Sequence, residues 1–301
     1  MPAVDSRTRI RNIQARLKVP GTGIFDIPTA QAFEALAGYP MRADANQLTH
    51  IVSVQMFLKI KVDGVVGPEM LTRVENFLSA KLPPLPAGTS IRVSRRSMDM
   101  LIGFEVSSEA QYNKSYQKPI WPGGESGVTI GIGYDLGFND RSTIAAAWRD
   151  FVGTDTLSVL QSVAGLTGTS AKNALPGTRS VIIDYNTAQS VFYQTTLPVY
   201  ARRTKNTYPG MEKLPPDAQG ALLSLVYNRG EGLSGPSRTE MKNIVALVAA
   251  QDLKGISKQI RNMKRLWQGK NLPGLLARRD EEASLLEQAN FNILSEDIII
   301  I

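Results

Sequence analysis

The sequence of 301 residues contains no cysteine and only one histidine, His50. Without cysteine the chain can form no disulfide and offers no thiol nucleophile or Cys-based metal site. A single histidine excludes multi-histidine metal sites and disfavours a zinc hydrolase. A Ser-His-Asp triad would have to use His50, which we interpret as a surface or packing residue. We therefore expect no metal and no other cofactor.

The sequence also lacks a long apolar run. No stretch approaches the roughly 18 apolar residues that a bilayer-spanning helix needs, so we expect no stable membrane insertion. The first ten residues carry charges and no apolar core, unlike a secretory signal peptide. The short run Ile298–Ile301 is interpreted as either a docking strand or a frayed tail.

The charge is unbalanced, with a formal net charge of +7 and a pI near 9.5. Such a surface favours anionic partners, among them nucleic acid and the bacterial envelope. Lysine and arginine are scattered along the chain rather than gathered in one cluster, which is not typical of nucleic-acid binding. We therefore expect no nucleic-acid partner.

The length suits two domains, because one domain usually takes about 100–200 residues. Four prolines and glycines fall within residues 83–88 and favour an extended spacer over helix or strand. We predict a first domain over residues 1–82, a linker over 83–91 and a second domain over 92–301.

An internal repeat lies before the linker. The two copies align at an offset of 41 residues, which pairs Gln14 with Gln55, Gly23 with Gly64, Ile24 with Val65 and Phe33 with Val74. Each copy predicts a helix, a tight glycine turn and a second helix. The second copy carries Asp63-Gly-Val-Val-Gly67. This segment resembles the small three-helix peptidoglycan-binding domain of wall hydrolases, which implies wall binding.

After the linker, a helical spacing links Met98, Leu101, Ile102 and Glu105. Glu105 therefore shares a face with apolar residues. A carboxylate on such a face is poorly solvated, which favours the protonated form that a general acid needs. Alone, the pattern fits equally well an ordinary glutamate at the edge of an apolar stripe.

A glycine-rich segment follows, over residues 123–137. It alternates Val128, Ile130 and Ile132 with Thr129, Gly131 and Gly133. This is the period of a β-strand with one apolar face and one face of small side chains. Glycines in a strand often mark the close approach of a ligand or of another backbone.

A helix with a glutamate, then a loop and Thr-Ile-Gly-Ile-Gly, resembles the start of the active site in phage-type lysozymes. Two later blocks agree, in the order found in that family: Ala221–Gly230, with Asn228 near its end, and Gly274–Leu286. The resemblance implies a muramidase with Glu105 as general acid and Thr129 on the hairpin. We interpret Arg278 and Arg279, in the last block, as mainly structural.

The second carboxylate departs from the common family pattern, which has an aspartate before the threonine. Here that loop offers only Glu125, whereas Asp135 follows Thr129, as in the pesticin-type enzymes. We favour Asp135 over Glu125 as the partner of Thr129 in positioning water. Asp135 could instead be structural, tying the end of the hairpin to the next helix.

The resemblance implies inverting hydrolysis of the β-1,4 bond after N-acetylmuramic acid, with the carboxyl groups roughly 6.5–9.5 Å apart. Substrate contacts are expected from Glu125, Gly131, Tyr134 and Asn228. Gly, Ser and Thr are frequent over residues 166–178, which we interpret as a mobile loop over the cleft.

We therefore expect a mostly α (α+β) protein that acts as a monomer on peptidoglycan in the periplasm, after delivery by a holin or a secretion system. The alternatives are a wall-binding protein without catalytic activity, a chitinase-like glycosidase and a lytic transglycosylase.

Overall fold

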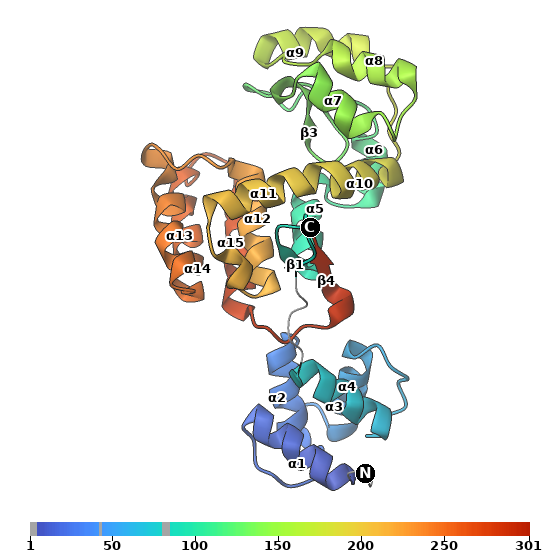
Figure 1. Ribbon diagram of the computed structural model, residues 1–301, viewed down its shortest axis with the longest axis vertical. Helices are drawn as coiled ribbons and strands as arrows, with labels where there is room; N and C mark the ends of the chain where they lie inside the picture. Colours follow the sequence, from blue (N-terminus) through green and yellow to red (C-terminus); the bar gives the residue numbers. More distant parts are fainter. Residues whose placement is uncertain (1–4, 42–43, 80–84) are drawn as a thin grey trace.

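The computed structural model describes residues 5–41, 44–79 and 85–301, and Figure 1 shows its arrangement. It is mostly helical, and the strands of the described residues form two sheets of two strands each. The predicted mostly α (α+β) class is confirmed. No helix within these ranges has the length and apolar character needed to cross a membrane.

The N-terminal part contains four helices: α1 (Ser6–Leu17), α2 (Ile27–Ala37), α3 (Gln47–Phe57) and α4 (Pro68–Ser79). The resemblance implied three. The difference arises because both copies of the repeat form a complete helix-turn-helix. Side chains at the N-caps stabilise three of the helix starts, namely Asp5, Asp26 and Asn46.

The two repeat copies have the same internal hydrogen bonds. Gln14 donates to the carbonyl of Ile24 over 2.8 Å and accepts from the backbone N–H of Gly23 over 2.9 Å. Gln55 makes the same pair of bonds to Val65 and Gly64, over 3.0 and 2.9 Å. Gly23 and Gly64 have φ values of +73° and +72°, a conformation that favours glycine. The predicted alignment at an offset of 41 is confirmed.

The remainder of the chain forms a second helical body with two lobes (Figure 1). Its elements are β1 (Arg92–Ser94), α5 (Arg95–Val106), α6 (Glu109–Ser115), β2 (Thr129–Ile130), β3 (Tyr134–Asp135), α7 (Arg141–Trp148), α8 (Thr154–Ser162), α9 (Gly168–Ala174), α10 (Tyr185–Val191), α11 (Leu197–Thr207), α12 (Pro216–Arg229), α13 (Thr239–Ala249), α14 (Leu253–Asn262), α15 (Pro273–Gln288) and β4 (Ile298–Ile300).

The smaller lobe holds β2, β3 and α6 to α9. In the larger lobe α5, α11 and α15 pack against α12, and α13 and α14 pack beyond α15. Helices α10 and α11 run from one lobe to the other and are joined by a π-helical turn over Phe192–Thr196. Every residue of α12 from Pro216 to Val226 is buried. This continuous burial makes α12 the central helix of the larger lobe.

Two separate clusters of buried apolar side chains form the cores. One gathers residues from Ile10 to Phe77 and also Leu294, and the other gathers residues from Ile91 to Ile301. The predicted bounds differ from this division at two residues, because Ile91 of the predicted linker belongs to the second core and Leu294 of the predicted second domain belongs to the first. The boundary itself stays a prediction, because residues 80–84 lie outside the described ranges.

Two segments answer questions that the sequence left open. Ile298–Ile300 is a docking strand: β4 pairs antiparallel with β1, and Val93 lies opposite Ile299. The prediction of a mobile loop over 166–178 is wrong. Residues Gly168–Ala174 form α9, which the fully buried side chain of Ala171 anchors in the core.

Candidate active site

Glu105 lies near the end of α5, whose sequence explains its position. The helix begins after Ser94, whose hydroxyl accepts a hydrogen bond from the backbone N–H of Ser97. Met98 and Leu101 are fully buried, so the face that Glu105 shares points toward the core. The side chain of Glu105 is 19% exposed, so solvent reaches part of it.

Arg278 from α15 holds the other side of that carboxylate. Its Nη1 donates to Oε1 of Glu105 over 2.7 Å. The rest of the guanidinium is buried against α12, where it donates to the carbonyl and the hydroxyl of Ser224 over 3.2 and 3.1 Å. Glu282 also lies beside it, 3.4 Å from Nε. Because these bonds fix the guanidinium, they also fix the orientation of Glu105.

The free oxygen of Glu105 faces the hairpin at Gly133. A Cβ on Gly133 would lie 3.1 Å from Oε2 of Glu105 and 3.0 Å from the hydroxyl of Tyr227. Gly133 has a φ of +70°, so its backbone conformation also favours glycine. The absence of a side chain therefore lets the hairpin backbone approach both the carboxylate of Glu105 and the hydroxyl of Tyr227 closely.

Tyr227 of α12 lies against the same glycine. Its hydroxyl donates to the carbonyl of Ile132 over 2.8 Å. Burial raises its pKa well above the ordinary value, and the negative charge of Glu105 raises it further. Tyr227 therefore keeps its proton at neutral pH and ties the hairpin to α12.

Thr129 and Asp135 lie opposite each other on β2 and β3. The hydroxyl of Thr129 lies 3.4 Å from the carbonyl of Gly127. The carboxylate of Asp135 accepts from the backbone N–H groups of Gly127 and Gly137, at 2.9 and 2.8 Å. Burial raises the pKa of Asp135 above its ordinary value, and the bonds from Gly127 and Gly137 oppose that rise. These two bonds are what a structural role of Asp135 at the end of the hairpin predicts. The aspartate also lines a cavity.

That cavity has a volume of about 280 Å³ and lies between the hairpin, α7 and α11. Gly133 and Asp135 line it from the hairpin, and Tyr200 and Arg203 line it from α11. The ring of Tyr200 lies 4.5 Å from that of Tyr227. Gly133 thus lies against the carboxylate of Glu105 and also lines the cavity, whereas Glu105 itself does not line it.

The other predicted contact residues have varied surroundings. Glu125 is exposed, and its carboxylate approaches Gly168 of α9 rather than Glu105. Gly131 packs against the ring of Trp148, and Tyr134 is buried edge-on against the same ring. Asn228 is half-buried on the last turn of α12, next to Tyr227.

His50 is a packing residue, as one of the two interpretations held. It is fully buried in the N-terminal core, where Nδ1 lies 2.9 Å from Oε2 of Glu34. Within the described ranges, no group of three or more His, Asp or Glu side chains could hold a metal ion.

Sequence reasoning missed two residues of the site, Arg278 and Tyr227. Arg278 was interpreted as mainly structural because its helix offers acidic partners at i+3 and i+4. Arg278 and Arg279 are both buried, so the helix has more guanidinium groups in its core than the nearby buried Glu282 can pair. The sequence does not show this imbalance, because Asp280, Glu281 and Glu282 follow the two arginines directly. Tyr227 stands beside Asn228 in an apolar block, and no pattern in the sequence singles it out.

Residues 101–274 match the family described as "Domain of unknown function (DUF8812)". Because the match covers more than half of the sequence, the chain belongs to this family. The matched region includes Glu105, Thr129, Asp135 and Tyr227 and ends before Arg278. No match is found among curated proteins.

Proposed function

We propose that this member of the DUF8812 family is a peptidoglycan hydrolase that uses Glu105 as general acid on the β-1,4 bond after N-acetylmuramic acid. One observation carries the proposal. The carboxylate of Glu105 is held by Arg278 through Oε1, while Oε2 lies against Gly133 of the hairpin, a glycine that also lines a cavity.

A general acid must present its proton in one direction, toward the leaving oxygen. The bond from Arg278 occupies Oε1. The proton is then carried by Oε2, on the side of the hairpin. A sugar bound across the hairpin would place its glycosidic oxygen there. Glycine at position 133 supports this, because a side chain there would press on Oε2 of Glu105 and crowd the approach of the sugar.

Asp135 and Thr129 are proposed to position the attacking water. Asp135 lines the cavity next to Gly133, and Thr129 lies opposite it across the two strands. In an inverting enzyme this carboxylate acts on the sugar face opposite the acid. The amide bonds from Gly127 and Gly137 would hold its oxygens in place while it does so.

The same amide bonds support a second candidate, a lytic transglycosylase. Asp135 already accepts from two backbone N–H groups, which is also what a purely structural residue would do. A transglycosylase needs an acid but no residue to activate water, because a hydroxyl of the sugar itself attacks. Its product carries an anhydro end in place of a hydrated one.

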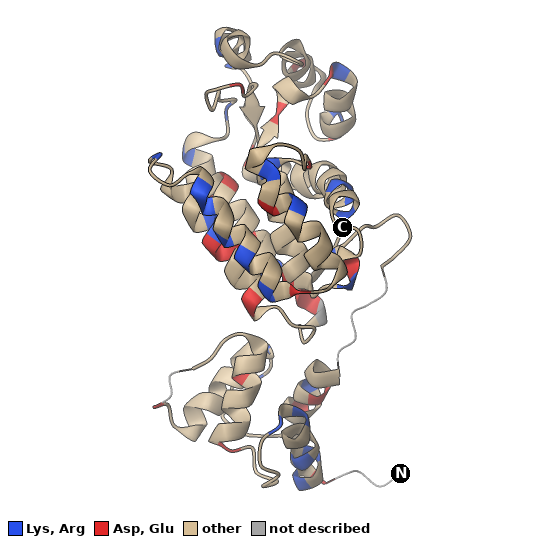
Figure 2. Cartoon of the chain, turned by 90° about the vertical axis from the view of Figure 1, so that its left-hand side faces the viewer, with Lys and Arg blue, Asp and Glu red and all other residues tan. Residues whose placement is uncertain are grey.

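The N-terminal part is proposed to bind the cell wall, and its repeated glutamine turns support the resemblance on which that rests. Peptidoglycan is the proposed partner, reached in the periplasm through a holin or a secretion system. Nucleic acid is not proposed. Figure 2 shows acidic residues among the basic ones on the larger lobe, where Arg261 and Lys264 pair with Asp280 and Arg265 pairs with Glu240.

The test is incubation of isolated sacculi with the parent protein, with Glu105→Gln and with Glu109→Gln, followed by mass spectrometry of soluble products. Glu109 is an exposed glutamate in the first turn of α6, so it controls for the change in chemistry. Loss of the acid should lower the rate roughly 10²–10⁴-fold, and Glu109→Gln should leave it unchanged. Hydrated ends support hydrolysis, and anhydro ends support the transglycosylase. Sacculi that stay intact with the parent protein contradict both enzymes.

A further inference from the structure

The geometry points to residues 290–301 as a clasp that holds the N-terminal module in one orientation on the catalytic domain. Here the N-terminal module means α1 to α4. The clasp leaves α15, passes along the module and returns to β1 (Figure 1). Its assignment rests on contacts alone and does not depend on the proposed reaction.

The clasp contacts the N-terminal module through one apolar side chain and two polar ones. Leu294 is 7% exposed and belongs to the apolar core that α1 to α4 form, although it lies more than 200 residues away in the sequence. The side-chain amide of Asn290 donates to the carbonyl of Leu36, at the end of α2, over 2.9 Å. Lys59, just after α3, pairs with Asp297 over 2.9 Å. An apolar side chain and two polar groups therefore fix the clasp to α2 and α3.

The clasp is also built into the catalytic domain. Ile298–Ile300 pair with Arg92–Ser94 in a two-stranded sheet. The carbonyl of Ile301 accepts from the backbone N–H of Ile91 over 3.0 Å, and its side chain lies in the core of this domain. Asp297 joins the two parts, because it pairs with Lys59 on one side and lies 3.5 Å from Arg95 on the other.

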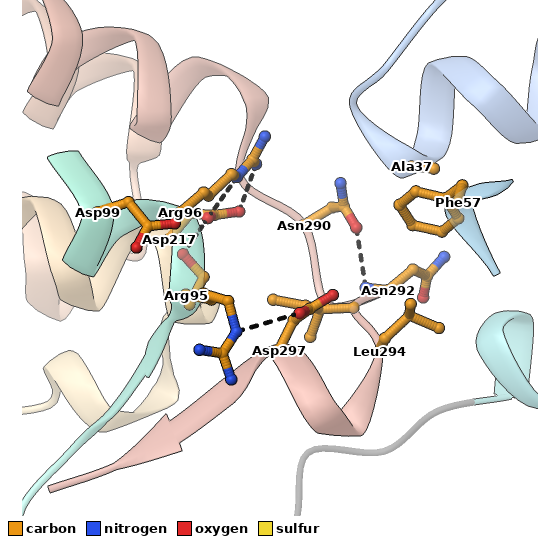
Figure 3. Close-up of a pocket in the computed structure, with 12 residues that line it drawn as sticks. Ala37, Phe57, Arg95, Arg96, Asp99, Asp217, Asn290, Asn292, Leu294 and Asp297 are labelled. Carbon is orange, nitrogen blue, oxygen red and sulfur yellow. Dashed lines mark hydrogen bonds and ion pairs between the residues drawn. The ribbon is translucent and has the colours of Figure 1, made fainter. Parts of the chain in front are cut away.

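Figure 3 shows the space that the clasp encloses, a cavity of about 220 Å³. Ala37 and Phe57 line it from the module, Arg95 and Asp217 from the catalytic domain, and Asn292 from the clasp. Two domains that share only a small interface are expected to move relative to one another. A second connection, fixed in both cores, removes most of that freedom.

The test measures the distance between the two parts in the full chain. The chain has no cysteine, so Asn12→Cys and Lys242→Cys place one label on each part without background. Both positions are exposed, one on α1 and the other on α13. Pulsed electron-spin resonance should give one narrow distance distribution for the parent pair. Leu294→Asp, which puts a charge into the module core, should broaden it severalfold.

Phe291→Asp is the matched control, because Phe291 lies in the same segment but is 45% exposed. It should leave the distribution narrow. A second variant, Asn290→Ala with Lys59→Ala, removes contacts without placing a charge in the core, and should also broaden the distribution while the circular dichroism stays unchanged. A broad distribution in the parent, no broadening in either clasp variant, or equal broadening by Phe291→Asp would overturn the inference.

Discussion

Glu105 and Arg278 are separated by 173 residues in the sequence, yet Oε1 and Nη1 lie 2.7 Å apart. The pair joins the first long helix of the C-terminal domain, α5, to its last, α15. Arg278 is almost fully buried, and Ser224 of α12 and Glu282 surround the rest of its guanidinium. The candidate acid is therefore oriented by the core of the larger lobe and not by the hairpin that it faces.

Replacing Arg278 by methionine should destabilise the protein, because it leaves the carboxylate of Glu105 without its cation, whereas Glu282 keeps Arg279 at 2.7 Å. Removing one partner of a buried ion pair typically costs about 3–5 kcal/mol. We expect a loss near the lower end of that range, since Glu105 is partly open to solvent. Urea unfolding of the full chain measures it.

Arg149→Met is the matched control, since Arg149 is exposed and its Nε donates to the carbonyl of Ala145 in the helix that it follows. It should change the stability by less than about 0.5 kcal/mol. Glu105→Gln should lower the free energy of unfolding less in the Arg278→Met variant than in the parent, because the pair is already broken there. Additive losses would show that Glu105 and Arg278 do not interact in solution.

Substitution of Gly133 by alanine should impair the site more than the fold. A non-glycine residue at a left-handed φ costs roughly 1–2 kcal/mol. Gly124→Ala is the control, because Gly124 has a φ of +58° but nothing lies within 4 Å of its added Cβ. Both variants should lose stability from the left-handed φ, and Gly133→Ala should lose somewhat more because its Cβ also meets Glu105 and Tyr227. Only Gly133→Ala should lose activity on sacculi, because its Cβ presses on Glu105 and Tyr227. Equal activity in the two variants would argue that the close approach of Gly133 to Glu105 does not matter for activity.

Local patterns predicted the parts of the site that depend on local structure. The helical spacing from Met98 placed Glu105 on the buried face of α5, and the alternation of Val128, Ile130 and Ile132 predicted their burial in the hairpin region. The offset of 41 residues predicted the paired glutamine turns. Each of these patterns reflects a helix or strand period or a glycine turn, which a short window of sequence contains.

Contacts between distant segments were not predictable in the same way. The pairing of Arg278 with Glu105 depends on how α15 crosses α12, and the burial of Leu294 depends on a chain that returns to the first module. Composition also misled over residues 168–174, where glycine, serine and threonine suggested a loop. Burial of Ala171 stabilises a helix there, because tertiary packing outweighs weak local propensity.

Gln55→Leu should destabilise the N-terminal module. Gln55 accepts from the backbone N–H of Gly64 and donates to the carbonyl of Val65, and leucine can do neither. Unsatisfied groups of this kind cost about 1–3 kcal/mol. Hydrogen exchange read by mass spectrometry should rise over residues 61–79. Gln31→Leu is the control, because Gln31 is half-buried in α2 and its side chain makes no hydrogen bond within the described ranges. Equal exchange in the two variants would contradict the role of the Gln55 hydrogen bonds in stabilising this turn.

The stability contribution of Asp135 should depend on pH in an unusual direction for an aspartate. Burial raises its pKa above the ordinary value of 3.8, so the folded protein binds this proton more tightly than the unfolded chain does. The contribution is then fully present below the unfolded pKa and is lost as the pH rises through the folded one. The measurement compares the parent with Asp135→Asn by urea unfolding between about pH 3.5 and 7.

Asparagine does not titrate, so the contributions of all other groups cancel in the difference between the two proteins. The free energy of unfolding of the parent minus that of the variant should fall as the pH rises. A difference that grows with pH would mean that the amide bonds from Gly127 and Gly137 outweigh burial and lower the pKa instead. Asp135 would then be anchored as a permanent anion, which would favour its structural role in the hairpin over a role in accepting a proton from water.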